Sequence, residues 1–397
     1  MKTVLAYSGG LDTSVIIKIL QKEYNSDVVT FTLELGQGES DLKEIEAKAK
    51  KLGAIATYSI DARKEFFDDY ITKAIKANGM YEGKYPMGTS IGRPLIAKKL
   101  VEIAKKEKAD AVAHGSTGKG NDQVRFDVTF RSLDPSLRII APIREKWLSR
   151  EEAIDYAEKN GIPLGGITKK KIYSVDENLW TRSIEGGPME DAMNEPPEDA
   201  FKLTVSPDKA PDKPEYVTIG FEKGIPISLN GKKLGGVELV TTLMKLGGKH
   251  GVGRIDMIED RLVGIKSREV YECPAAVIII EAHKELESMV FTREQKLFKE
   301  NIDSKWAQMA YMGQWYEPLM DDLNAFIDST QRYVTGNVKV KLFKGNCMVV
   351  GRESQYSLYN VKLATYDKSD TFSHKSAEGF IKLWGLPSEV AGMRKRK

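Results

Sequence analysis

A glycine- and hydroxyl-rich segment near the amino terminus carries the clearest chemical pattern in the sequence. It runs from Ser8 to Ser14, reads SGGLDTS, and follows a short apolar strand, Thr3 to Tyr7. At a turn from a strand into a helix, backbone amides and the positive end of the helix dipole converge on an anion. The two glycines permit close backbone approach, and the three hydroxyls can donate to phosphate oxygens. We therefore expect a phosphate-binding loop rather than a turn that only caps a helix.

The absence of the P-loop motif limits the kinds of phosphate-transfer reaction that this loop can serve. The sequence contains no G-x-x-x-x-G-K-[ST], so it lacks the lysine with which P-loop enzymes grip the β and γ phosphates. The pattern thus argues against an ADP-forming kinase or ATPase.

A second polar constellation spans His114 to Phe126 and reads HGSTGKGNDQVRF. It follows another predicted strand, at the carboxyl edge where open α/β sheets bind ligands. A hydroxyl, an amide, a carboxylate, a lysine and an arginine lie within it, which is enough to recognise a zwitterionic amino acid. The structural alternative is a glycine-rich surface turn.

The elements that must position these residues follow a regular alternation. We expect strands at 3–7, 27–33, 54–60, 109–114 and 138–142, and helices at 12–23, 41–52, 63–77 and 93–106. Short apolar strands alternating with charged amphipathic helices indicate a doubly wound parallel sheet, an α/β fold.

Beyond this sheet the sequence predicts a second, α+β domain. Prolines break the stretch 163–214 into loops, and Asn230-Gly231 is typical of a hairpin turn. Further expected elements are helices at 237–245, 275–287 and 317–328, a hairpin at 255–265 and paired strands at 338–350. We place a nucleotide-binding domain at 1–168, a synthetase domain at 169–365 and a helical tail at 366–397.

Composition excludes several other classes of protein. The chain has 397 residues, with 60 basic and 57 acidic side chains and a net charge of +3, so no strong attraction to nucleic acid or membrane follows. Two cysteines and four scattered histidines support neither a disulfide framework nor a His- or Cys-based metal centre. No signal peptide or membrane span is predicted, so we expect a cytoplasmic protein.

The two constellations resemble known families. SGGLDTS is similar to the SGG-x-D-[ST]-S motif of the N-type ATP pyrophosphatases, which cleave ATP between its α and β phosphorus atoms. Over thirteen positions the second constellation resembles argininosuccinate synthases. Matching runs continue along nearly the whole chain: 85–94, SVDEN at 174–178, GKHGVGRID at 248–256 and GRES at 351–354.

The resemblance implies a ligand for each of several residues. The adenine nucleotide would contact Ala6, Tyr7, Ser8, Gly9, Gly10, Leu11, Asp12, Thr13, Ser14, Leu33 and Gly115. Citrulline would contact Tyr85, Ser90, Asn121, Arg125, Ser174, Ser183, Glu259 and Tyr271. Aspartate would contact Thr117, Asn121 and Asp122.

The resemblance also implies a reaction. Citrulline, aspartate and ATP would give argininosuccinate, AMP and diphosphate through citrullyl-AMP, in arginine biosynthesis and the urea cycle. Mg²⁺ would assist. Asp12 is acidic although it lies beside the expected phosphates, so our hypothesis is that it either binds this ion or orients the loop. Asp122, near the aspartate amine, is a candidate base. The family is tetrameric, so the tail would contact a neighbouring subunit.

The chain departs from the family pattern at three positions. Asp260, Glu269 and Cys273 stand where the family usually has Asn, Gly and Thr. The added negative charge calls into question the geometry around Glu259 and Tyr271.

Two other functions share parts of the pattern. A tRNA-modifying enzyme could use the same loop, but it would need reactive cysteines and a basic RNA-binding surface. A non-catalytic adenine-nucleotide sensor would need neither the second domain nor the amino-acid constellation.

Overall fold

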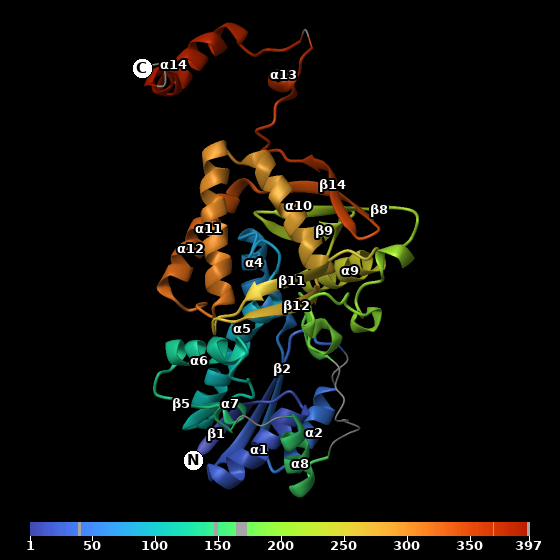
Figure 1. The fold of residues 1–397 in the computed structure, drawn as a ribbon, viewed down its shortest axis with the longest axis vertical. Helices are drawn as coiled ribbons and strands as arrows, with labels where there is room; N and C mark the ends of the chain where they lie inside the picture. Colours follow the sequence, from blue (N-terminus) through green and yellow to red (C-terminus); the bar gives the residue numbers. More distant parts are fainter. Residues whose placement is uncertain (39–40, 147–149, 164–172, 368, 395–397) are drawn as a thin grey trace. The chain divides into compact units, whose positions relative to one another are not determined.

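The computed structural model describes residues 1–38, 41–146, 150–163, 173–367 and 369–394. The chain forms two compact units, Met1–Gln355 and Tyr356–Lys397. Figure 1 labels the helices and strands of both units.

The amino-terminal part of the larger unit alternates strands and helices. In chain order these are β1 (Lys2–Ala6), α1 (Leu11–Glu23), β2 (Asp27–Glu34), α2 (Leu42–Lys51), β3 (Ala56–Asp61), α3 (Arg63–Phe66), a π-helical turn (Phe67–Ile71), α4 (Thr72–Lys76), α5 (Gly88–Glu107), β4 (Ala111–Ala113), α6 (Asp122–Leu133), β5 (Arg138–Ile140), α7 (Pro142–Lys146) and α8 (Arg150–Lys159).

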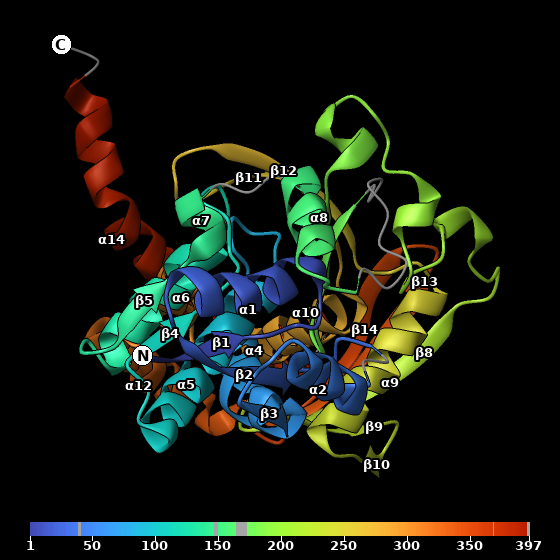
Figure 2. The same cartoon turned by 90° about the horizontal axis from the view of Figure 1, so that it is seen from below.

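These strands form a five-stranded parallel sheet in the order β3-β2-β1-β4-β5. The strands are apolar on both faces because helices cover both. Val4 and Val29 pack in one core with α5, while Leu5 and Val28 pack in another with α1 and α8. Figure 2 shows α1 and α5 on opposite sides of β1. Since β1 and β4 are neighbours, the segments that follow them meet at the same carboxyl edge.

The structure confirms the predicted doubly wound sheet, with the five expected strands at β1 to β5. It also contains elements that the sequence pattern did not predict. The second constellation runs directly into α6, and α5 begins at Gly88, several residues before the expected start at 93.

The rest of the larger unit carries two antiparallel sheets and four long helices. Its elements are β6 (Ser174–Glu177), β7 (Arg182–Glu185), β8 (Glu215–Glu222), β9 (Ile225–Leu229), β10 (Lys232–Lys233), α9 (Gly236–Lys249), β11 (Arg254–Asp260), β12 (Lys266–Glu272), α10 (Pro274–Val290), α11 (Arg293–Tyr311), α12 (Pro318–Thr330), β13 (Gly336–Phe343) and β14 (Asn346–Glu353).

The two sheets have the strand orders β10-β9-β8-β13-β14 and β11-β12-β7-β6. The α+β prediction is therefore confirmed. Asn230 and Gly231 turn the β9–β10 hairpin with φ of 50° and 80°, as the dipeptide predicted. The hairpin expected at 255–265 extends further, because its second strand, β12, ends at Glu272. Within 163–214, β6 and β7 were predicted as loop.

The smaller unit contains α13 (Val361–Ala364) and α14 (His374–Met393). Neither helix has a buried residue, and large apolar side chains such as Leu383 and Trp384 are 75% and 67% exposed. This unit therefore has no core of its own.

The predicted division at residue 168 falls within 164–172, outside the described residues, and the three-domain scheme stays a prediction. None of the helices in the described ranges is both long and apolar enough to cross a membrane.

Candidate active site

The phosphate loop joins the end of β1 to α1. Gly9 has φ +76°, the left-handed conformation that glycine favours, and Gly10 is the N-cap of α1. Ser8 Oγ lies 3.2 Å from Thr13 Oγ1, and Ser14 Oγ donates to the Gly10 carbonyl at 2.6 Å. The loop hydroxyls thus gather at the amino end of a helix, as an anion site requires.

The remaining residues predicted to contact ATP lie on adjacent strand ends. Leu33 is near the end of β2 and Gly115 follows β4, and these strands flank β1 on either side. A side chain on Gly115 would come within 3.1 Å of Ile16 in α1, so this position is close against the phosphate-loop helix. The structure brings Ala6 to Ser14, Leu33 and Gly115 to one edge.

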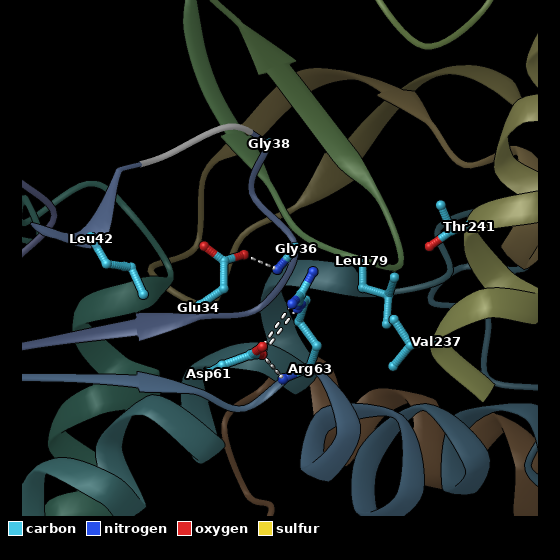
Figure 3. A pocket seen from close by; sticks show the side chains of 9 residues that line it. All are labelled: Glu34, Gly36, Gly38, Leu42, Asp61, Arg63, Leu179, Val237 and Thr241. Atoms are coloured by element: carbon cyan, nitrogen blue, oxygen red, sulfur yellow. Dashed lines mark hydrogen bonds and ion pairs between the residues drawn. The ribbon is translucent and has the colours of Figure 1, made fainter. Parts of the chain in front are cut away.

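A cavity of about 430 Å³ lies where β2 and β3 end, and its lining includes Glu34, Asp61 and Leu179 (Figure 3). Three of the polar side chains that line this cavity bond to other residues of its lining. Arg63 forms an ion pair with Asp61 at 2.6 Å, and Glu34 accepts from the amide of Gly36 at 2.6 Å. We assign this cavity no role in the reaction.

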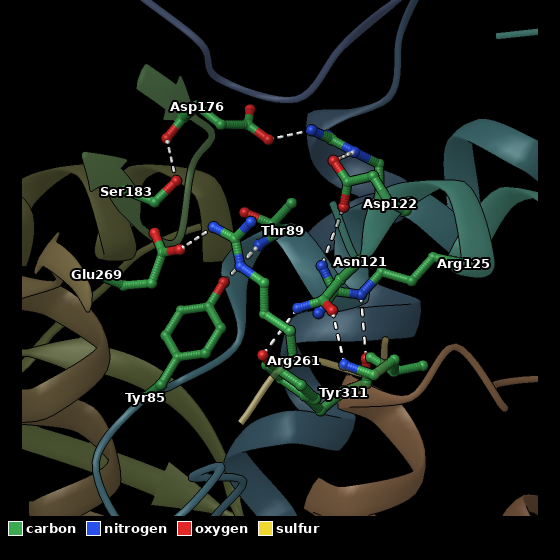
Figure 4. Close-up of polar contacts among 12 residues, drawn as sticks. Tyr85, Thr89, Asn121, Asp122, Arg125, Asp176, Ser183, Arg261, Glu269 and Tyr311 are labelled. Atoms are coloured by element: carbon green, nitrogen blue, oxygen red, sulfur yellow. Dashed lines mark hydrogen bonds and ion pairs between the residues drawn. The ribbon is translucent and has the colours of Figure 1, made fainter. Parts of the chain in front are cut away.

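The second constellation forms the amino end of α6, where its polar side chains contact distant elements (Figure 4). Arg125, which is 4% exposed, donates to Asp122 at 2.9 Å and to the carbonyl of Tyr311 at 3.0 Å. Asn121 donates to the Tyr311 hydroxyl at 2.8 Å and accepts from the amide of Leu262 at 2.9 Å. The constellation is therefore a built site and not a surface turn.

Asp122 is held between two arginines. Arg93 donates to one carboxylate oxygen at 2.8 Å, Arg125 donates to the other, and Arg93 also pairs with Asp176 of β6. Burial raises the pKa of Asp122, but the two guanidinium groups outweigh burial and hold that pKa below its usual value. Asp122 is thus ionised at neutral pH, which suits charge stabilisation better than proton abstraction.

Glu259 is held by two tyrosines. It is 3% exposed, and the hydroxyls of Tyr271 and Tyr311 each donate to one of its oxygens. Burial raises the pKa of Glu259, although these hydroxyls and Arg125 act in the opposite direction. Tyr85 stacks on Tyr271 with ring centroids 4.0 Å apart, which adds an aromatic wall.

The predicted serines and threonine are placed differently from one another. Ser90 Oγ is buried and has no hydrogen-bond partner among the described residues, so it has a donor to offer a ligand. Ser183 pairs with Tyr271 across β7 and β12 and therefore lies on the Glu259 side of that sheet. Ser174 and Thr117 are exposed, and Ser174 lies opposite Glu185 in the β6–β7 pair.

The carboxyl group of Glu269, one of the departures from the family pattern, contacts an arginine. Arg261 binds Glu269 at 2.5 Å (Figure 4). The same guanidinium also binds Glu185. Burial and the charge of Glu185 raise the pKa of Glu269 to about 8. The bond between Tyr271 and Glu259 forms nonetheless, and Asp260 lies exposed beside Lys266.

Arg93, Arg261 and Tyr311 contact the site but were not predicted as site residues. Arg93 lies within the matching run 85–94, whereas no local pattern marks Arg261 or Tyr311, because each reaches the site from an element distant in sequence. Tyr311, for example, lies 190 positions from Asn121. Asp176 lies within the matching run from 174 to 178 but was not predicted as a site residue.

The fold and site define an α/β protein with an anion-binding loop and a charged, aromatic-walled pocket on neighbouring strands. Residues 2–163 match the family model for the arginosuccinate synthase N-terminal HUP domain, and residues 173–391 match the model for the arginosuccinate synthase C-terminal domain. The chain belongs to the argininosuccinate synthase family.

Relatives named argininosuccinate synthase align over nearly the full length. The Pyrococcus furiosus protein is 56% identical, covering 98% of this chain and 94% of its own. Those of Endomicrobium trichonymphae and Symbiobacterium thermophilum are both 53% identical over all of this chain, covering 95% and 99% of their own lengths.

Proposed function

We propose that this chain joins citrulline to aspartate at the expense of ATP, releasing AMP and diphosphate. The observation that carries the proposal is the placement of two sites at one sheet edge. The phosphate loop follows β1, and the amino end of α6 follows the neighbouring strand β4. Membership of the argininosuccinate synthase family supports the choice of substrates.

In the first step the ureido oxygen of citrulline attacks the α-phosphorus of ATP, and diphosphate leaves. Ala6 to Ser14, Leu33 and Gly115 bind the nucleotide, with the amides and hydroxyls of the loop on the departing phosphates. In the second step the neutral amine of aspartate displaces AMP from citrullyl-AMP. Positioning and charge stabilisation carry most of the rate enhancement.

Citrulline is bound through its two charged ends. Arg125 attracts its α-carboxylate, and Glu259 attracts its α-ammonium. The unpartnered hydroxyl of Ser90 and the aromatic wall of Tyr85 and Tyr271 complete the pocket. We keep Asn121, Ser174 and Ser183 as further proposed contacts.

Aspartate is bound by Thr117, Asn121 and Asp122. Asp122 attracts the ammonium with which aspartate binds, and this ammonium releases a proton to solvent before its nitrogen attacks. The low pKa of the Asp122 carboxyl argues against Asp122 as the base.

Mg²⁺ fits the loop through Asp12. This carboxylate is exposed in the first turn of α1, and no hydrogen bond or ion pair engages it among the described residues. Oxygen ligands from one carboxylate and the substrate phosphates are those that Mg²⁺ prefers. Bound there, the ion would neutralise charge on the departing diphosphate.

We further propose a cytoplasmic homotetramer that serves arginine synthesis and, where it operates, the urea cycle. The exposed apolar side chains of α14 support assembly, because the unit that contains them buries none of them itself.

A turnover assay separates this function from its rivals. AMP and diphosphate should form only when citrulline is present, and argininosuccinate only when aspartate is added. Binding of ATP without turnover would favour a nucleotide sensor, and formation of ADP would reject the loop assignment. The tRNA-modifying alternative lacks a reactive thiol, because burial raises the pKa values of both Cys273 and Cys347.

A further inference from the structure

The phosphate loop contains no cation. Between Ser8 and Ser14 the single ionisable side chain is that of Asp12, which is acidic. Diphosphate leaves ATP with several negative charges, and enzymes of phosphoryl transfer commonly place a lysine against such groups. Amides and hydroxyls supply only partial charges, so a positive side chain should come from another element.

Helix α2 brings one to the loop. The Lys48 ammonium donates to the carbonyl of Gly9 at 2.7 Å. Ile45 lies one turn earlier in α2 and packs on the same glycine, since a side chain built on Gly9 would meet its Cγ1 at 3.0 Å. Residues three apart share one face of a helix, so α2 rests on the loop through this pair.

The charge of Lys48 is left without a carboxylate partner. Among the described residues no Asp or Glu lies within ion-pair distance of its ammonium, and the side chain is half-buried. Burial lowers the pKa of Lys48 below its ordinary value, while the more distant Glu44 acts against this shift. A half-buried cation of this kind is stabilised by an anion. Lys50, in the same helix, is exposed instead.

We propose that Lys48 is a catalytic residue that binds the β- and γ-phosphates of ATP and stabilises diphosphate as it leaves. The inference rests on the proposed function. In this step a bond forms between the ureido oxygen and the α-phosphorus, and the bond from that phosphorus to the bridging oxygen breaks. The electron pair stays on diphosphate. Lys48 keeps its proton and offsets the added charge.

The test compares three substitutions of Lys48 with Lys50→Met as a matched control in the same helix. Lys48→Met should lower kcat for AMP formation about a hundredfold and weaken product inhibition by diphosphate at least about tenfold. The KM for citrulline should stay near its wild-type value. Lys48→Arg should recover part of both losses, and Lys50→Met should match the wild-type chain.

Lys48→Gln separates charge from loop support, because its amide can still donate to the Gly9 carbonyl. It should behave like Lys48→Met. A Lys48→Gln variant with wild-type kcat and wild-type inhibition by diphosphate would overturn the inference. If the wild-type chain itself forms no AMP, the proposed function is rejected together with the role of Lys48. If the wild-type chain forms AMP and the Lys48→Met variant is equally active, only the role of Lys48 is rejected.

Discussion

Two carboxylates in the site have pKa values shifted in opposite directions, because their neighbours differ. Asp122 faces two guanidinium groups, and its pKa is lowered. Glu259 faces mainly tyrosine hydroxyls, and burial raises its pKa. Asp122 therefore stays charged over a wide range of pH, whereas the charge of Glu259 depends on each hydrogen bond that it accepts.

Tyr311→Phe tests whether the charge of Glu259 depends on the hydrogen bonds that it accepts. Loss of one donor raises the pKa of Glu259 further, and Glu259 attracts the citrulline ammonium only when it is ionised. The KM for citrulline should rise about tenfold. The increase should be largest on the acid side and shrink as the pH rises above that pKa. Steady-state kinetics over a range of pH measure this.

Several other charged or titratable groups also act on the pKa of Glu259. They are Arg125 in α6, Arg261 in the turn before β12, Tyr271 and Glu269 in β12, and Tyr81 and Tyr85 before α5. Tyr316→Phe is the control, since that hydroxyl bonds Tyr70 at 3.1 Å and no other residue in the part of the chain that the structure describes. Equal effects of the two substitutions on the KM would contradict the account.

The site was predictable where its residues share one run of sequence. Asn121, Asp122 and Arg125 lie at the start of one helix, so their spacing alone placed them together. Tyr311 and Lys48 were not predictable, because packing of distant helices brings them to their partners. The contact of Glu269 with Arg261 likewise depends on the turn between β11 and β12.

At the scale of elements, one buried carboxylate fastens β12 to its surroundings. Glu272 is fully buried and pairs with Arg182 of β7 at 2.6 Å. It also accepts from the amides of Lys202, Leu203 and Thr204 at 2.8 to 3.1 Å. The sheet that carries Glu259 and Tyr271 is thereby joined to the loop before β8.

Glu272→Ala should lower the free energy of unfolding by about 3–5 kcal/mol. It removes the nearer carboxylate partner of buried Arg182, leaving the 3.4 Å pair with Glu177. It also removes the acceptor of the amides of Lys202, Leu203 and Thr204. Denaturant unfolding measures the change. Asp260→Ala, in the next strand, should cost less than about 1 kcal/mol, since its pair with Lys266 is exposed. A loss at Glu272 as small as that at Asp260 would show that the buried pair does not hold the sheet.

The same scale explains which elements the sequence predicted. The first parallel strands are continuous apolar runs, so they can be predicted from the sequence without knowing which strands they pair with. β6 and β7 have only four residues each and lie in a proline-rich stretch. They are defined by strand pairing, since β7 pairs with β12 and β6 pairs with β7. α6 was hidden because the glycines before it dominate the local pattern.

At the scale of the molecule, the unit from Tyr356 onward is incomplete by itself. Its helices bury no residue, and Phe380, Ile381 and Leu383 are each more than half exposed. Apolar area of this kind is stabilised when another surface covers it.

Light scattering should therefore report a tetramer for the full chain and a smaller species for a chain that ends at Gln355. The paired substitution Leu383→Asp and Trp384→Asp should have the same effect in the full-length chain. A full chain that is monomeric at micromolar concentration would contradict the proposed assembly.

Transfer of the ureido oxygen of citrulline to the α-phosphorus of ATP is the central claim. Citrulline labelled with ¹⁸O at that oxygen tests it most directly, with mass spectrometry of the nucleotide product. The mechanism predicts one labelled oxygen in AMP for each argininosuccinate formed. Unlabelled AMP, or ADP in its place, would contradict it.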